Sequence, residues 1–206
     1  MTLGPGRALR IGLTGPIGCG KSTVARWLGE RQGVIAVDAD RIAQEVLRPG
    51  TAEVEAVYRR FGPALRRADG TLDRAELGRL VFADPVALRE LEAIVHPAVR
   101  PRILAAIAEA DRAGARAVVV EAIKLVEGGL AESCDEVWLV TCDEEVQLER
   151  LIGRGMEPTD AAARLAAQRG LATRLRPRAT RVIDTSGSAE ATSQIVERLL
   201  AEALAR

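Results

Sequence analysis

Residues 15–23 of the chain read Gly15-Pro16-Ile17-Gly18-Cys19-Gly20-Lys21-Ser22-Thr23. The spacing is G-x-x-x-x-G-K-[S/T], and these residues lie between an apolar run, Ala8–Thr14, and a segment of helical period, Thr23–Gln32. Glycines let such a loop curl until successive backbone N–H groups point at phosphate oxygens, and the positive end of the following helix adds to the attraction. The motif therefore predicts a nucleotide-binding strand–loop–helix unit.

Most residues of this phosphate loop (residues 15–22) have an expected role. Lys21 would reach the β- and γ-phosphates of ATP and act in catalysis, and the Ser22 hydroxyl would ligate Mg²⁺. The expected ATP-binding residues are Gly15, Gly18, Cys19, Gly20, Lys21, Ser22 and Thr23. The alternative is a glycine-rich turn that binds nothing. Only two of the 29 basic residues are lysines, so the motif would arise by chance in about one such sequence in 800.

Cys19 has two interpretations. A thiol near a helix N-terminus can have a lowered pKa and react readily. The other interpretation, which we favour, is a small neutral side chain that fills space in the loop.

Composition excludes several classes of protein. The chain has 206 residues, of which 48% are hydrophobic and only 2% aromatic, which suits one α/β unit with an insertion. Acidic and basic residues balance at 29 each, so there is no electrostatic signal for nucleic-acid binding. We find no apolar run of membrane-spanning length, no secretory signal and no CxxC pair. We therefore expect a cytoplasmic protein without a disulfide framework, and no sequence signal separates a monomer from a homo-oligomer.

Five short apolar runs predict a parallel sheet whose strands are covered on both faces, because they are nearly continuous and alternate with helical patterns. The runs are Ala8–Thr14, Val34–Val37, Ala117–Ala122, Glu136–Cys142 and Arg181–Ile183. The helical patterns beside them are Thr23–Gln32, Glu144–Gly153 and Ala189–Arg206.

Two insertions interrupt this pattern. The first is too long for a loop and holds helical stretches over Arg41–Leu47, Ala52–Phe61, Arg74–Phe82, Val86–Val95 and Val99–Ala113, with a turn signal at His96-Pro97. The second runs from Arg154 to about Arg178, and Thr159 is its expected helix N-cap. We expect a core over 1–40, 114–153 and 179–206, a helical domain over 41–113 and a lid over 154–178.

Two carboxylates follow the second strand. Ligands of open parallel sheets gather at the carboxyl ends of the strands. Asp40 is placed to face an acceptor hydroxyl as the catalytic carboxylate, and Asp38 is closer to the loop and the metal. The alternative for Asp40 is an N-cap of a helix that begins at Arg41. Glu121, at the end of the third strand, resembles a Walker B acid, which is a weak signal for metal binding.

Arginines precede the second insertion. Arg150 and Arg154 lie four residues apart on one face of a predicted helix, where they would bind ATP phosphates, and Arg150 is the expected transition-state residue. The alternative is a solvated helix face. His96 is the only histidine, and a helix-boundary role is favoured over general-base catalysis. Lys124 is best interpreted as a surface lysine.

Together, these motifs resemble the pattern of one known family. The chain resembles the dephospho-CoA kinases, and the similarity runs through most of the chain in the expected order. The matching segments are 11–15, 18–23, 37–40, Ala68-Asp69-Gly70-Thr71-Leu72-Asp73-Arg74, Leu80-Val81-Phe82-Ala83-Asp84-Pro85, 91–97, Gln147-Leu148-Glu149-Arg150, Arg154, Gln168, 182–184 and Gly187.

The resemblance implies a P-loop NTPase fold of the nucleotide-monophosphate-kinase type, with a five-stranded parallel sheet, a helical substrate-binding insertion and a small lid. It implies Mg²⁺-dependent transfer of the ATP γ-phosphate to the ribose 3′-hydroxyl of dephospho-CoA. Asp40 matches the catalytic carboxylate of the family and Arg150 its phosphate-binding arginine, while His96 and Leu125 match positions on the acceptor side.

The resemblance also shows departures. The family usually has Pro-Leu-Leu-Phe-Glu where this chain has residues 123–127, Ala-Asp where it has Ala179-Thr180, and Asn where it has Thr185. The alternative function is another P-loop kinase for a nucleoside or a sugar. A GTPase is disfavoured because neither lysine follows an asparagine. A silent ATP-binding regulator is disfavoured by Lys21, Ser22, Asp40 and Arg150.

Overall fold

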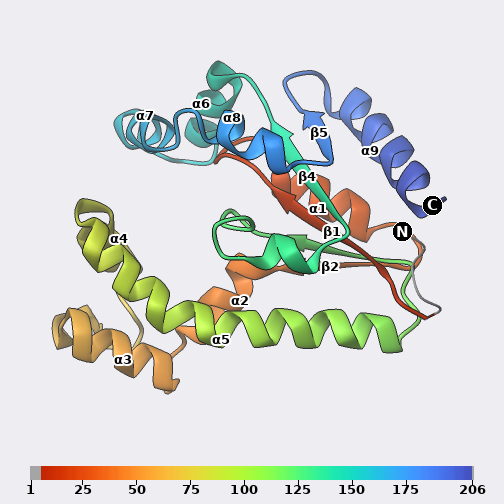
Figure 1. Ribbon diagram of the computed structural model, residues 1–206. Coiled ribbons are helices and arrows are strands. Elements are labelled where there is room, and N and C mark those ends of the chain that lie inside the picture. The colour runs from red at the N-terminus through yellow and green to blue at the C-terminus, as the bar shows by residue number, and fades with distance from the viewer. Residues whose placement is uncertain (1–5, 206) are drawn as a thin grey trace. The chain divides into compact units, whose positions relative to one another are not determined.

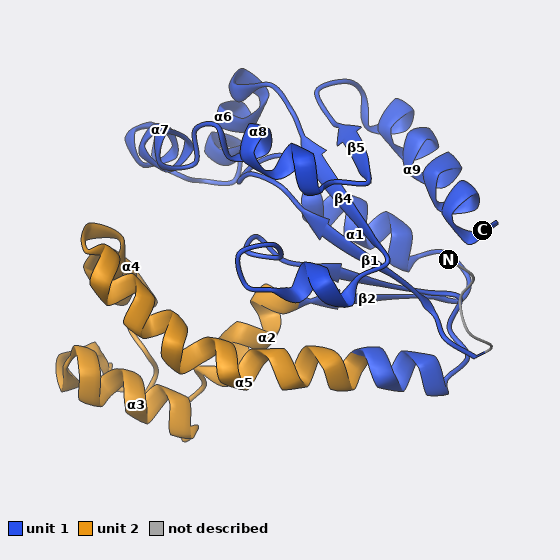
Figure 2. Cartoon of the chain, in the orientation of Figure 1, with its two compact units in different colours: residues 1–38, 107–206 blue, residues 39–106 orange. Residues whose placement is uncertain are grey.

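The computed structural model describes residues 6–205 of the chain. The chain divides into two compact units (Figure 2): unit 1 contains the residues up to Asp38 and those from Ile107 onward, and unit 2 contains Ala39–Ala106. The 154–178 segment lies within unit 1. The functional division into core, helical domain and lid stays a prediction. Within residues 6–205, no helix combines the length and apolar character needed to cross a bilayer.

Unit 1 is built on one sheet. All strand pairs are parallel and the spatial order is β2-β3-β1-β4-β5, which confirms the predicted five-stranded parallel sheet (Figure 1). The strands are β1 (Leu9–Thr14), β2 (Val34–Asp38), β3 (Ala117–Glu121), β4 (Glu136–Thr141) and β5 (Arg181–Asp184). The expectation that every strand is covered on both faces is wrong for the two edge strands. Ile35 of β2 and Val182 of β5 are each 37% exposed, since an edge strand has a neighbouring strand on one side only.

Helices α1 (Lys21–Gly29) and α9 (Ala189–Leu204) pack together on the sheet (Figure 1). Val24 and Leu28 of α1 and Val196 of α9 are buried with Ile11 and Leu13 of β1 in one hydrophobic cluster. Burying such a side chain contributes about 1.5–3 kcal/mol. This packing holds the start of α1 at the end of β1, where the phosphate loop joins them.

The remaining helices of unit 1 form a smaller group. These are α6 (Glu144–Gly153), α7 (Pro158–Ala167) and α8 (Leu171–Leu175), followed by a 3₁₀ turn at Arg176–Arg178. A further 3₁₀ turn, Leu130–Ser133, lies beside β1. Thr159 is not an N-cap, contrary to the prediction, because α7 already begins at Pro158 and Glu157 occupies the N-cap position. Pro158 fits the first helical position, where its missing N–H would have no partner anyway.

Unit 2 is helical. It contains α2 (Ala39–Val46), α3 (Ala52–Phe61), a 3₁₀ turn (Pro63–Leu65), α4 (Arg74–Ala83) and the first part of α5 (Pro85–Arg112). The side chains of Thr51 and Asp73 cap α3 and α4 by accepting hydrogen bonds from Val54 N and Glu76 N. A separate apolar cluster that includes Val54, Leu65 and Leu77 forms the core of this unit.

The predicted break at His96-Pro97 is wrong, because α5 continues through it as a single helix. Pro97 and Pro101 lie inside the helix, and each removes one backbone donor at a cost of about 3 kcal/mol. Val99 and Ile103 beside them are buried. Their packing offsets the cost, so tertiary contacts overrule the local turn signal.

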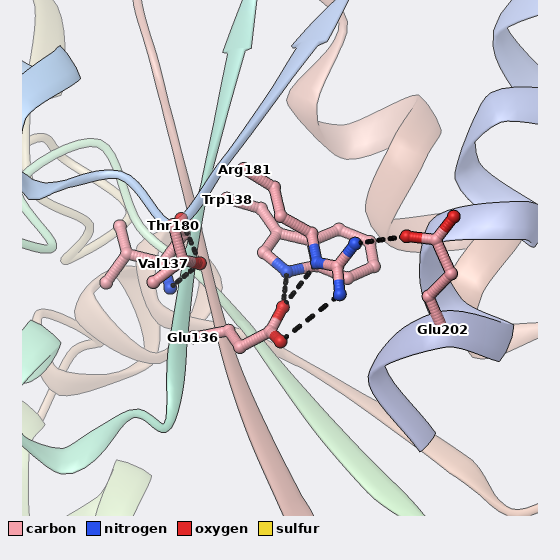
Figure 3. A network of polar contacts seen from close by, with 6 residues as sticks. All are labelled: Glu136, Val137, Trp138, Thr180, Arg181 and Glu202. Atoms are coloured by element: carbon pink, nitrogen blue, oxygen red, sulfur yellow. Dashed lines mark hydrogen bonds and ion pairs between the residues drawn. The ribbon is translucent and has the colours of Figure 1, made fainter. Parts of the chain in front are cut away.

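The first residues of β4 and β5 are joined by a buried polar network (Figure 3). Glu136 accepts hydrogen bonds from Trp138 Nε1 at 2.6 Å and from Arg181 Nε at 2.7 Å. Arg181 also donates from Nη1 to Glu202 of α9 at 2.7 Å. The Glu136 side chain is 5% exposed and the Glu202 side chain 48%. The network therefore has one buried and one solvated carboxylate around the same guanidinium group.

This difference gives a stability prediction. Glu136→Gln leaves the Arg181 cation without its buried countercharge and should lower the free energy of unfolding by about 3 kcal/mol. Glu202→Gln is the matched control at the solvated end and should cost less than about 1 kcal/mol. Urea unfolding followed by far-UV circular dichroism measures both values, and equal losses would show that burial of the pair does not matter.

Candidate active site

The phosphate loop passes very close to the sheet where it leaves β1. Gly15 has φ 147°, and a Cβ built on it would lie 2.1 Å from Val140 O of β4. Gly20 has φ 84° and is the N-cap of α1. Both conformations favour glycine. The predicted strand–loop–helix unit is therefore confirmed in its local geometry.

Lys21 is buried, with only 7% of the residue exposed. Its Nζ donates a hydrogen bond to Pro16 O at 2.9 Å, so the ammonium group points into the loop to which it belongs. A lysine carries three donors on a flexible stem. It can exchange this carbonyl for phosphate oxygens by a short side-chain movement.

Ser22 and Glu121 lie in contact beside the loop. Ser22 Oγ donates to Glu121 Oε1 at 2.7 Å, and Glu121 is buried at the end of β3. Asp38, at the end of β2, pairs with Glu121 in the strand register. The ends of β2 and β3, which carry Asp38 and Glu121, therefore lie next to one another. Glu121 is hydrogen-bonded to Ser22, the expected metal ligand.

This oxygen-rich donor set fits Mg²⁺. A hydroxyl and a carboxylate oxygen 2.7 Å apart are hard donors of the kind that Mg²⁺ prefers. Among the described residues there is no group of three or more His, Cys, Asp or Glu side chains placed to hold a metal ion. A nucleotide-dependent Mg²⁺ site needs no such group, since phosphates and water supply the other ligands.

Cys19 is a buried structural thiol. Its Sγ donates to Pro16 O at 2.8 Å, and burial raises the pKa of the thiol to about 11 although the nearby Lys21 ammonium lowers it in part. At neutral pH the side chain is therefore an un-ionised thiol. Burial and the raised pKa both favour the interpretation of Cys19 as a small neutral filler over the reactive-thiol alternative.

Arg150 is held against the phosphate loop by Thr185. Its Nη1 donates to Thr185 Oγ1 at 2.9 Å and its Nη2 to Thr185 O at 2.7 Å. Thr185 is buried, and its hydroxyl donates to Cys19 O at 2.9 Å. The hydroxyl therefore connects the arginine of α6 to the loop.

A cavity of about 190 Å³ adjoins these residues. Arg150, Arg154, Gly20, Thr23 and Trp27 contribute to its wall, and α9 closes it with Ala189 and Thr192. It shares Gly20 and Thr23 with the nucleotide-binding motif. A mixed wall with an aromatic ring and two cationic groups suits the nucleoside part of a nucleotide.

The expected acceptor-side residues lie elsewhere in the chain. Asp40 is the second residue of α2 in unit 2, exposed, and is not an N-cap of a helix beginning at Arg41, because the helix begins at Ala39. His96 is an exposed residue inside α5, so its favoured helix-boundary role is wrong. Leu125 is fully buried in unit 1 with its Cδ2 against Gly12. A ligand contact by Leu125 would have to come from its backbone, and its acceptor-side role stays a prediction.

Comparison with known proteins identifies the family. The sequence profile described as Dephospho-CoA kinase matches residues 9–191. A dephospho-CoA kinase of Symbiobacterium thermophilum is 49% identical over 188 residues, which cover 91% of this chain and 78% of that protein. The chain belongs to the dephospho-CoA kinase family.

Solved structures agree with this assignment. TT1252 from Thermus thermophilus superposes with a TM-score of 0.77 at 36% identity, covering 95% of this chain and 98% of that one. A dephospho-CoA kinase from Campylobacter jejuni gives a TM-score of 0.67 at 27% identity, covering 94% and 96%. Members of this family are ATP-dependent kinases, so this chain is a phosphotransferase of the same family.

Sequence reasoning assigned no role to three residues near this site. Thr185 stands at a departure from the family pattern and had no assigned role, yet it binds both Arg150 and the loop. Trp27 follows Thr23 by four residues, a helical spacing that could have placed it on the same face of α1. Gln168 accepts a hydrogen bond from Ile17 N at 2.7 Å. Only its match to the family pattern pointed to it.

The hydroxyl of Thr185 can be tested directly. Thr185→Val keeps the shape of the side chain but removes the buried hydroxyl that accepts a hydrogen bond from Arg150. The change should lower kcat/KM for ATP about tenfold. Thr185→Ser keeps the hydroxyl and should stay within about threefold of the native value. Steady-state ADP release measures both, and equal activities would rule out a role for the hydroxyl in holding Arg150.

Proposed function

We propose that this chain transfers the γ-phosphate of ATP to the ribose 3′-hydroxyl of dephospho-CoA, giving coenzyme A and ADP. One observation carries the proposal: the match to the family extends over residues 9–191 and includes a phosphate loop in which Lys21 is already directed inward. The site lies at the carboxyl ends of β1, β2 and β3, where open parallel sheets bind their ligands.

ATP binding follows from the loop. The backbone of residues 15–22 and the N-terminal end of α1 attract the phosphates. Lys21 Nζ leaves Pro16 O and moves to the β- and γ-phosphates, so one hydrogen bond is exchanged for a charged contact. The nucleoside occupies the cavity beside Thr23 and Trp27.

Mg²⁺ would be held by Ser22 and Asp38, with Glu121 alongside Ser22. When bound, the ion would neutralise part of the negative charge on the phosphates. The protein residues contribute oxygen donors of suitable hardness. The Ser22 hydroxyl and Glu121 are joined to each other in the structure, so both are oriented before ligands arrive.

The acceptor hydroxyl is activated by Asp40. Only one residue separates it from Asp38 at the end of β2, so the chain itself keeps Asp40 within about 7 Å of that strand end, measured between Cα atoms. Asp40 accepts the proton of the 3′-hydroxyl as the oxygen attacks the γ-phosphate. His96 and the backbone of Leu125 are proposed acceptor contacts, with residues 41–113 as the acceptor-binding domain.

Arg150 and Arg154 stabilise the charge that spreads over the transferring phosphoryl oxygens. Thr185 orients Arg150, while Arg154 is exposed beside the same cavity. The 154–178 segment acts as the lid and excludes water from the reaction. ATP and dephospho-CoA are the proposed substrates, and the cytoplasm is the proposed compartment. Neither nucleic acid nor a membrane is a proposed partner.

Asp40→Asn tests the acceptor role. Loss of the base should lower kcat about 100-fold, while the Kd for ATP stays unchanged because Asp40 contacts only the acceptor. Asp38→Asn is the paired variant and should instead raise the Mg²⁺ concentration needed for half-maximal rate. Isothermal calorimetry with ATP and steady-state kinetics separate the two, and an equal loss of ATP affinity in Asp40→Asn would contradict the assignment.

The substrate is tested by ADP release with dephospho-CoA, adenosine or pantetheine as acceptor. We expect dephospho-CoA to raise the rate at least about 100-fold above ATP hydrolysis without acceptor, because only a correctly bound alcohol reaches the phosphoryl group. Adenosine lacks the pantetheine arm and pantetheine lacks the ribose. Equal turnover of adenosine would favour the alternative, a nucleoside kinase.

A further inference from the structure

One peptide unit of the phosphate loop is hydrogen-bonded on both sides. The carbonyl oxygen of Pro16 accepts from Lys21 Nζ at 2.9 Å and from Cys19 Sγ at 2.8 Å. The N–H of the same peptide unit, which belongs to Ile17, donates to Gln168 Oε1 at 2.7 Å. A trans peptide is planar, so its N–H and C=O point in opposite directions. A group that fixes the N–H therefore also fixes where the carbonyl points.

Gln168 is firmly placed to do this. It is the C-cap residue of α7, and its backbone N–H donates to Leu165 O at 3.0 Å. Its own carbonyl accepts from Leu171 N at 3.0 Å, at the start of α8. The residue is half-buried. With its backbone held on both sides, the amide side chain has a short and defined reach to the loop.

The side chain of Ile17 contacts the same group of helices. It packs against a small apolar cluster formed by Leu151, Ala161 and Leu165 of α6 and α7. The 154–178 segment thus binds residue 17 of the loop twice, through its N–H and through its side chain. Neither contact uses a residue to which the reaction assigns a chemical role.

We infer that Gln168 is a positioning residue that keeps the Pro16 carbonyl directed at Lys21, and so places the lysine for an incoming nucleotide. Without an acceptor at position 168, the Ile17 N–H loses its partner, and only the hydrogen bonds from Lys21 and Cys19 to the Pro16 carbonyl then resist rotation of the peptide. Rotation would turn the N–H toward the Lys21 ammonium, which repels it, and the lysine would leave its place. The inference deepens the proposed function and rests on it for the role of Lys21.

The test compares three variants. Gln168→Met keeps a long unbranched side chain without an oxygen, and Gln168→Glu keeps an oxygen acceptor. Gln194→Met makes the same chemical change at an exposed site of α9 and serves as the control. Well below the unfolding transition, Gln168→Met should lower kcat about tenfold, while Gln194→Met leaves it unchanged. A merely structural role would lower the unfolding midpoint but not kcat.

Gln168→Glu supplies the rescue. Its kcat should return to within about threefold of the native value because the acceptor is restored, while KM for ATP rises because the added charge repels the phosphates. A Gln168→Glu enzyme as slow as Gln168→Met would overturn the inference, since the acceptor would then not be the feature that matters. Native kcat in Gln168→Met would overturn it as well.

A substrate-free measurement separates this inference from the proposed function. Amide hydrogen exchange of Ile17 in ¹⁵N-labelled protein should be about tenfold faster in Gln168→Met than in Gln194→Met. Affinity for ADP, measured by calorimetry, should fall in parallel. Unchanged exchange of the Ile17 amide would contradict the inference, whichever alcohol the enzyme phosphorylates. Faster exchange together with no turnover of dephospho-CoA would defeat the proposed function and leave the inference standing.

Discussion

The close approach of Gly15 to β4 is the constraint on which the site depends. A single added methyl-sized atom would lie 2.1 Å from Val140 O, so any side chain at this position would push the phosphate loop off the sheet. At Gly15 the loop therefore runs directly against the backbone of β4, beside β1, with no space for a side chain between them. Lys21, Ser22 and the start of α1 take their positions from that contact.

The parts of this arrangement that depend on neighbouring residues in the sequence could be predicted. Five apolar runs identified the five strands to within a residue or two, and the loop motif located Lys21 and Ser22. Local signals failed where packing overruled them, as at His96-Pro97 inside α5. They were silent where contacts join distant residues: Thr185 binds Cys19 across 166 positions, and Gln168 binds Ile17 across 151. No periodicity or spacing carries such information, because the fold alone brings these groups together.

Two departures from the family pattern have structural roles at opposite ends of β5. Before the strand, Thr180 Oγ1 lies 3.0 Å from both the N and the O of Val137, next to the Glu136–Arg181 pair. After the strand, Thr185 binds the loop and Arg150. A strand of four residues has few ladder hydrogen bonds of its own. Anchoring both ends fixes its register, and with it the direction of Arg150.

The identity of the loop cation follows from the same geometry. Arginine has replaced lysine almost everywhere in this chain, and Lys124 is the only lysine besides Lys21. A guanidinium group is planar and carries its donors in a fixed fork, whereas an ammonium group is a compact charge with donors that rotate freely. Lys21 is buried, and its ammonium group donates to one carbonyl oxygen. An arginine in the same buried space would have five N–H donors and only this acceptor, so most of its N–H groups would lack a partner. Because the same charge must also move from that carbonyl to phosphate oxygens, position 21 needs a lysine even in a chain that otherwise uses arginine.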